Sequence, residues 1–333
     1  MIERWFPTFR HWLVRVAPRV GRGLLILFVL IAIPWTHFNI KFGRQIERRL
    51  AALKADGLPV TMADVVPEPV PDDQNAAVVY DEVFRVWHYW SKPTGRPREP
   101  TQSPLSEVIK PFTYDDRKVV LDAQARKMLR SPEARDVLDK LRYGSERPYF
   151  LFPVNWEDGF GALFPHLAEC RDACRLIVAH ASLLSEEGRV TEALDWLLVS
   201  LRMSEQARSD PTLVGQFVAY AMQAIAFDGM RDVLSQAAVS PPVAAEFEQL
   251  LRGIDLDEGF RAAMDAERAM VCDVYDLYRR EPAEICSLLD IQRGFPTSIY
   301  FGWPGRPLHK LDQLIYLDYA KRFGELSEQP YRD

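Results

Sequence analysis

An uncharged stretch near the N-terminus constrains this chain more than any other feature. It runs from Gly23 to Ile40 and reads GLLILFVLIAIPWTHFNI. At a rise of about 1.5 Å per residue, it would form a helix roughly 27 Å long, close to the thickness of the hydrocarbon core of a bilayer. We therefore predict a transmembrane anchor over residues 23–40, with the lipid bilayer as its partner and Trp35 suited to the interfacial end.

A secretory signal peptide is the alternative, because the second half of this stretch is less apolar than the first. No small-x-small cleavage pattern follows, and the next residues are KFGR. We therefore favour an anchor that is not cleaved.

The residues ahead of the anchor, 1–22, are basic and amphipathic. Five arginines alternate there with apolar residues at helical spacing, which favours a short helix on the membrane surface. An N-terminal helix packed on the body is the alternative. Five basic residues also follow the anchor between positions 41 and 54, so the charges on its two sides nearly balance. A short basic tail before an apolar segment is typical of a signal anchor, so we expect a single-pass protein of the cell membrane with its body on the extracytoplasmic side.

The composition of the remaining chain, residues 41–333, is that of a globular protein. The 333-residue chain is 48% hydrophobic and carries a formal net charge of -6. Its basic residues form no run beyond the N-terminal region, so we expect no nucleic-acid partner. The disulfide state of the four cysteines cannot be read from their spacing, and none of them forms a CxxC motif. They are Cys170, Cys174, Cys272 and Cys286.

Helical periodicity dominates this body and predicts a mainly α fold. We expect helices at about 73–90, from 166, at 190–207, 210–234, 257–280 and 308–323, and another opened by Ser131-Pro132-Glu133. Proline, glycine and aromatic residues predict loops near 91–113, 143–165 and 288–307, the second of them pinned onto the core. SIYF, at 298–301, is the one short strand candidate.

The stretch PVPDDQNAAVVYDEVF, residues 69–84, contains adjacent side chains with oxygen atoms that could bind a metal ion. A calcium loop would need more oxygens at alternating spacing and a glycine bend. The apolar stripe that follows favours a helix start instead, with Asp72 as the N-cap, Asp73 in the first turn and Asn75 reaching back. Asn75 lies at the flank of the stripe and can also tie the helix to a neighbouring segment.

Two resemblances follow from short motifs. GRVTEAL, residues 188–194, resembles the turn and second helix of a tetratricopeptide-type hairpin, with Gly188 ending one helix and Ala193 at a close approach. No second copy occurs at a period near 34 residues, which disfavours a regular solenoid. The anchor, GLPVTMADVVPEPVPDDQNAA, FPHL, EEGRVTEAL and DPTLV together resemble an uncharacterised family of membrane-anchored helical proteins from bacteria. That resemblance implies a location and a helical fold but no activity.

The sequence identifies no catalytic residue, cofactor or metal ligand. His166, Cys170, Cys174 and His180 share one helical face, but the two histidines are about 21 Å apart along the axis, so we favour a packed interface there. HExxH, GxSxG and phosphate-loop motifs do not occur. Glu267, Asp273 and Asp276 could line a polar cleft, although an exposed face is commoner.

Two classes of function remain, and we rank the first higher. In the first, the body is a scaffold or protein-interaction module whose hairpins present a groove to a protein partner. In the second, the aromatic loops close over a pocket, and the protein is an envelope-associated enzyme or a small-molecule-binding protein. An apolar groove along residues 166–206 would support the first class, and a concave acidic pocket beside residues 150–165 the second.

Overall fold

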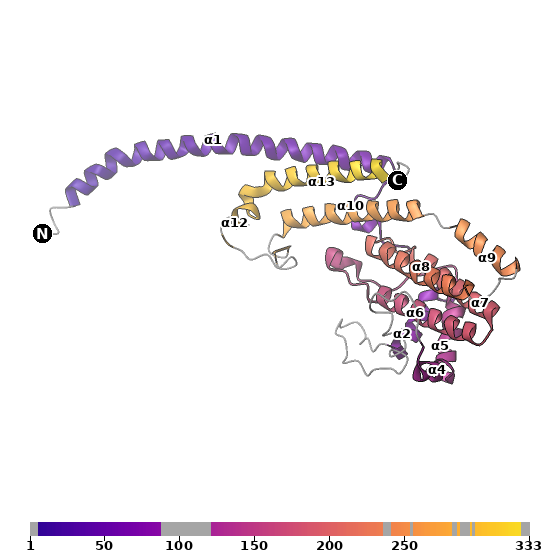
Figure 1. Ribbon diagram of the computed structural model, residues 1–333. Helices are drawn as coiled ribbons and strands as arrows, with labels where there is room; N and C mark the ends of the chain where they lie inside the picture. The colour runs from indigo at the N-terminus through magenta and orange to yellow at the C-terminus, as the bar shows by residue number, and fades with distance from the viewer. Residues whose placement is uncertain are drawn as a thin grey trace. The chain divides into compact units, whose positions relative to one another are not determined.

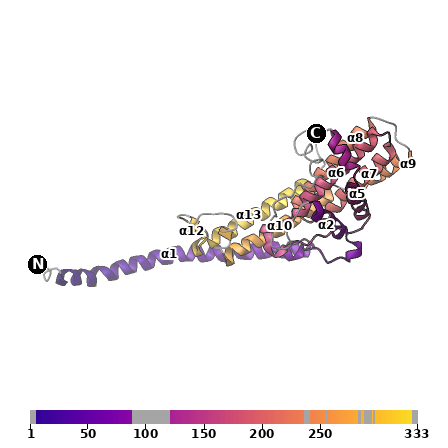
Figure 2. The same ribbon diagram turned by 90° about the horizontal axis from the view of Figure 1, so that it is seen from below.

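The expected mainly α fold is confirmed in a computed structural model (Figures 1 and 2). The structure describes residues 6–87, 121–235, 241–253, 256–281, 285–286, 294 and 297–327. These ranges are helical and contain no β-strand, although Asn75 and Tyr149 form an isolated parallel bridge. The loop expected near 91–113 lies outside the described residues.

The chain divides into two compact units. The anchor unit comprises residues 1–60 and 271–325, and the core unit comprises residues 61–270 and 326–333. Residues 41–60 and 271–325 group with the N-terminal helix.

The anchor unit is built on one continuous helix, α1 (Phe6–Ala55). Its other elements are the end of α10 (Leu256–Arg280), α12 (Thr297–Tyr300), η5 (Trp303–Gly305) and α13 (Arg306–Ser327). The strand considered at SIYF is wrong. Tyr300 ends a turn of α-helix, and its ring packs 4.5 Å from that of His309 in the next helix.

Helix α1 runs without a break through residues 6–22 of the expected basic segment and through residues 23–40 of the expected anchor, and residues 1–5 lie outside the described residues. Among the described residues, the part of α1 from Arg19 to Ala55 is long and apolar enough to cross a membrane, and an 18-residue window within it has a mean hydropathy of 1.9. Large apolar side chains from Leu24 to Ile33 are exposed in the structure. The helix ends before Gly57, whose φ of 76° is the left-handed conformation expected at a helix C-terminus.

The core unit consists of helices joined by short connections. In order they are η1 (Met62–Asp64), η2 (Asp72–Gln74), α2 (Ala76–Trp87), α4 (Ala123–Leu129), α5 (Pro132–Ser145), η4 (Trp156–Gly161), α6 (Pro165–Glu186), α7 (Val190–Ala207), α8 (Leu213–Leu234), α9 (Pro241–Arg252) and the first part of α10. The Ser131 hydroxyl accepts a hydrogen bond from the Ala134 amide at 3.1 Å, which confirms the expected N-cap of α5.

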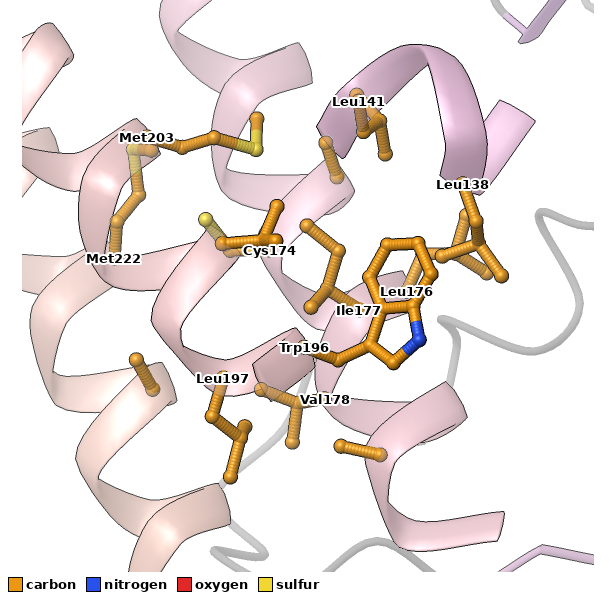
Figure 3. Packing of buried hydrophobic residues seen from close by; sticks show 14 of the residues in the cluster. Leu138, Leu141, Cys174, Leu176, Ile177, Val178, Trp196, Leu197, Met203 and Met222 are labelled. Atoms are coloured by element: carbon orange, nitrogen blue, oxygen red, sulfur yellow. The ribbon is translucent and has the colours of Figure 1, made fainter. Parts of the chain in front are cut away.

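Helices α6, α7 and α8 pack against one another and hold the centre of the core (Figure 3). Ile177 of α6, Leu197 of α7 and Met222 of α8 are fully buried there. Leu138 and Leu141 bring α5 onto the same cluster. The face of α6 predicted to be a packed interface is confirmed, because its cysteine, alanine and isoleucine side chains are all buried.

The α6–α7 hairpin forms where the sequence predicts it. Gly188 has a φ of 78°, so it adopts a backbone conformation that costs other residues energy, and the chain reverses there. Ala193 is fully buried at the close approach of the two helices. The hairpin leads directly into α8, and the segment before α6 lines part of a pocket.

Candidate functional site: a pocket beside the aromatic loop

The loop from residue 146 to 155 is fixed to the start of α2 by one buried asparagine. The Asn75 side-chain amide donates to the Leu151 carbonyl at 2.8 Å, and its oxygen accepts from the Leu151 amide at 2.9 Å. The same oxygen accepts from the Ala77 amide at 3.1 Å. Asn75 is therefore the residue that caps α2. The expected cap at Asp72 is wrong, because Asp72–Gln74 forms a separate turn of 3-10 helix before α2 begins.

A second group of hydrogen bonds holds the start of this loop. The Arg147 guanidinium donates to the carbonyls of Asp72 and Asn75 at 2.9 and 3.0 Å. The Gln206 amide of α7 donates to the Arg147 carbonyl at 2.7 Å. Its oxygen accepts from the Tyr80 hydroxyl at 2.7 Å. The loop is thus tied to α2 and α7 by polar contacts, most of which are partly shielded from water and are strengthened by this shielding.

Aromatic packing fixes the middle of the loop, as the sequence predicts. Phe150 and Phe152 are buried, and their rings meet edge to face at 5.2 Å. The Phe152 ring stacks on that of His166 at 4.3 Å with an interplanar angle of 10°. The same ring also stacks with Phe84 at 6.0 Å. His166, at the start of α6, is therefore held in one orientation by flat aromatic contacts.

A pocket of about 160 Å³ lies beside this loop. Its volume is below the roughly 300 to 1,000 Å³ of pockets that take drug-sized ligands, so it matches a small ligand or one end group of a larger one. The residues that line it come from the segment before α2, the aromatic loop and the starts of α6 and α8. They are Pro67, Glu68, Val70, Pro148, Tyr149, Phe150, Leu151, Phe152, Val154, Trp156, His166, Ser209, Asp210 and Pro211.

Two buried titratable side chains meet in this pocket. His166 Nε2 lies 3.6 Å from Asp210 Oδ2, and both side chains are only 6% exposed. The other carboxylate oxygen, Oδ1, accepts hydrogen bonds from the Thr212 amide at 2.9 Å and from the Thr212 hydroxyl at 2.5 Å. Thr212 in turn caps α8, because its hydroxyl accepts from the Gly215 amide at 3.0 Å. The α8 cap thus orients Asp210 and directs Oδ2 toward His166.

The charged side chains that line the pocket are acidic. Glu68 and Asp210 contribute carboxylates, and the lining residues include no lysine or arginine. Ser209 is not placed as a nucleophile, because its hydroxyl donates to the Gln206 carbonyl at 2.7 Å. Carboxylates beside the rings of Tyr149 and Trp156 are the combination that binds organic cations. The pocket therefore favours binding of a cation over covalent catalysis.

The residues weighed as a metal site do not come together. Cys170 and Cys174 are buried in the core, and burial raises the pKa of the Cys174 thiol to about 12 and that of Cys170 well above its usual range. His180 packs edge-on against Trp196 at 5.2 Å, far along α6 from the pocket. Among the residues that the structure describes, no group of three or more His, Cys, Asp or Glu side chains is arranged to hold an ion.

The acidic residues of α10 do not line this pocket either. Glu267 is half-buried, burial raises its pKa, and its carboxylate accepts from the backbone of Leu213. Asp276 pairs with Arg279 one turn later in the same helix. Each of these two carboxylates thus has a local partner, and neither lines the pocket beside the aromatic loop.

The sequence reasoning missed Asp210 and Glu68 as pocket residues. Asp210 precedes a proline at a helix start, a pattern that local capping explains fully. Its position opposite His166 depends on how α6 and α8 pack. No protein-family model, curated protein or solved structure matches this chain. The family resemblance suggested by the short motifs therefore stays a prediction.

Proposed function

We propose that this chain is a single-pass protein of the cell membrane whose helical body binds a small organic cation. Residues 23–40 would be the anchor, and the exposed apolar side chains from Leu24 to Ile33 support this. The basic tail before them favours a body on the extracytoplasmic side. A C-terminal alkaline phosphatase fusion tests the side, because activity of this reporter only outside the cytoplasm supports it and cytoplasmic folding of a fluorescent fusion contradicts it.

The observation that carries the binding proposal is the buried Asp210 carboxylate facing an aromatic-walled pocket. A buried carboxylate is costly unless a cation or hydrogen bonds compensate it. Oδ1 is compensated by Thr212, whereas Oδ2 has His166 at 3.6 Å, beyond ordinary hydrogen-bond distance. An ammonium group in the pocket would contact Oδ2, and Glu68 and the face of Trp156 would add attraction.

Saturation-transfer NMR on the full chain in lipid nanodiscs tests this proposal. The probes are methylammonium and tetramethylammonium, with tert-butanol as a neutral probe of similar size. We expect the cations to bind and tert-butanol not to. Asp210→Asn keeps the acceptor for Thr212 and should weaken cation binding more than about tenfold, because a buried charge pair is lost. Glu68→Gln, at an exposed site, should weaken it by a few-fold.

A matched control separates a specific loss from a general charge effect. Asp81 is exposed, lies outside the pocket lining and pairs with Arg85 on the surface of α2. Asp81→Asn should leave cation binding unchanged. Two results would contradict the proposal. One is that tert-butanol binds as well as the ammonium probes, and the other is that both pocket variants bind the cations with the affinity of the wild type.

A second candidate function, the protein-interaction module, rests on a different feature. An open apolar groove of about 420 Å³ lies between α8 and α9. Met230, Leu234, Phe247 and Leu251 line it, and Glu248 and Arg252 are the charged residues on it. It accepts apolar side chains of a partner helix in the helix-in-groove manner. This groove lies outside residues 166–206, where an apolar groove would have supported this class, and α8 packs against both helices of that hairpin.

Site-specific photo-crosslinking distinguishes this second candidate. A crosslinking residue at Leu251, in the groove, should yield a defined protein adduct, whereas one at Val214, which is exposed but outside the groove, should not. Leu234→Asp should abolish the adduct at position 251, because it places a charge on the apolar surface. An adduct that survives Leu234→Asp would exclude the groove as the binding surface.

A further inference from the structure

Helix α13 runs beside the second half of α1 in a fixed register (Figure 1). Three hydrogen bonds join α1 to α13 and to the turn before it. Trp35 donates to the Pro304 carbonyl of η5 at 3.0 Å. Lys310 donates to the Asn39 carbonyl at 2.9 Å, and Arg49 donates to the Asp318 carboxylate at 3.3 Å. The sequence separations of these pairs are 269, 271 and 269 residues. A nearly constant separation means that the two helices are parallel and advance together.

The start of α13 lies level with the end of the predicted anchor. The indole rings of Trp35 and Trp303 stack with centroids 4.0 Å apart and an interplanar angle of 28°. Trp35 belongs to the apolar stretch that ends at Ile40. Two rings in contact share a depth to within a few ångströms, so Trp303 enters the bilayer interface wherever Trp35 does.

The segment that carries Trp303 is fixed in place rather than attached at one point. The Tyr300 hydroxyl donates to the Asp312 carboxylate, and the Phe301 ring packs 5.4 Å from that of Tyr278 in α10. Gly305 is buried, and a Cβ there would overlap the Tyr300 carbonyl at 1.8 Å. The backbone between α12 and α13 therefore turns tightly and presents its side chains in a defined direction.

Three large apolar side chains of this segment remain exposed. Ile299 is 45%, Trp303 56% and Leu308 50% exposed, compared with 64% for Leu30 within the predicted span. At a separation of 269 residues, Leu308 lies level with Asn39. Of the three, Trp303 contacts the apolar stretch of α1 directly, through Trp35. In water this exposed apolar surface would be unfavourable in proportion to its area, whereas the acyl boundary of a bilayer stabilises it.

Basic side chains lie close to the C-terminal end of the predicted anchor. Lys41 and Arg44 of α1 and Arg306 of α13 are exposed. Long basic side chains at the end of a membrane helix extend toward the phosphates of the headgroups. Aromatic rings at the level of the headgroups with cations just beyond them are the pattern of a membrane interface.

We propose that Ile299, Trp303 and Leu308 form a second membrane-contact surface, which inserts into the same leaflet as the C-terminal end of the anchor. The partner is the interface of a lipid bilayer. This inference rests on the proposed anchoring through residues 23–40. Its consequence is that the C-terminal part of the chain returns to the membrane, so the anchor unit contacts lipid through two segments.

Depth-dependent fluorescence quenching of the full chain tests this surface. The protein is reconstituted into liposomes of phosphatidylcholine and phosphatidylglycerol, with and without doxyl-labelled lipids. The four native thiols are buried, so a single introduced cysteine takes an NBD label selectively. The test sites are Ile299→Cys and Leu308→Cys. Leu30→Cys reports the anchor itself. Tyr319 lies on the same face of α13 as Leu308, roughly 16 Å further along the helix. Tyr319→Cys is therefore the matched control, a site expected to stay in water.

We expect doxyl lipids to remove more than about half of the emission at positions 30, 299 and 308, and less than about a tenth at 319. Quenching at 30 without quenching at 299 and 308 would overturn this inference and leave the anchor intact. No quenching at 30 would overturn the anchor and this inference together. Equal quenching at 308 and 319 would also overturn it, because α13 would then lie along the membrane throughout.

Discussion

The backbone of Gly144 lies directly against the ring of Tyr80. A Cβ at position 144 would stand 2.4 Å from Cε1 of that ring, and Tyr80 is fully buried with its hydroxyl bound to Gln206. Gly144 is therefore required by the packing of α2 on α5, although both residues lie on helices where the sequence pattern alone would permit alanine at position 144.

We expect Gly144→Ala to destabilise the core unit by about 1 to 3 kcal/mol, because the Tyr80 ring cannot move away without losing its hydrogen bond and its packing. Urea unfolding of the detergent-solubilised chain measures this. In a Tyr80→Leu background the same substitution should cost much less, since the ring is absent. Equal costs in the two backgrounds would show that the clash with Tyr80 is not the cause.

Asn75→Ala should destabilise the core unit by about 2 to 4 kcal/mol. It removes two hydrogen bonds to the backbone of Leu151 and the cap to Ala77, and it leaves buried backbone groups unsatisfied. Asp72→Ala is the control, because Asp72 is exposed and does not cap α2. It should change the free energy of unfolding by less than about 0.5 kcal/mol. A larger loss for Asp72→Ala than for Asn75→Ala would restore Asp72 as the cap.

The core unit should become less stable as the pH decreases, because of His180. Burial and the nearby Arg189 and Arg142 lower the pKa of His180 from 6.5 to about 4. The unfolded chain therefore binds a proton at a higher pH than the folded chain. The contribution of His180 is fully present above about pH 6.5 and declines by roughly 3 kcal/mol as the pH falls to 4.

Unfolding free energies measured at several pH values between 7 and 4 test this expectation. His180→Gln cannot take up the proton, so its stability should decrease less steeply over the same interval than that of the wild type. Parallel curves for the two proteins would show that His180 does not contribute to the pH dependence.

The four cysteines should be unreactive in the folded protein. All are free thiols and buried, and burial raises the pKa of Cys174 to about 12. The thiolate is the reactive form, so maleimide should label the native chain slowly and label all four positions in denaturant. Mass spectrometry counts the labels. Rapid labelling of the native protein, or a disulfide on a non-reducing gel, would contradict this arrangement.

Local pattern was enough to predict much of this fold. The apolar stretch of α1, the stripe of α2, the cap at Ser131 and the turn at Gly188 all lie where the sequence places them, because helical periodicity, capping and positive φ act over a few residues. The same locality explains two errors. The aspartate before α2 has the pattern of an N-cap as much as Asn75 does, and SIYF has the alternation of a strand although its tyrosine packs into a helical turn.

The sequence by itself determined the helical class, the membrane-length apolar helix and most helix boundaries, since each depends on neighbours in the chain. Only the tertiary structure decided that Asn75 pairs with Leu151, 76 residues away, that Asp210 faces His166, and that Trp35 stacks on Trp303. Such contacts depend on which helix faces which and in what register. That choice is made by close packing of whole faces, and no short stretch of sequence encodes it.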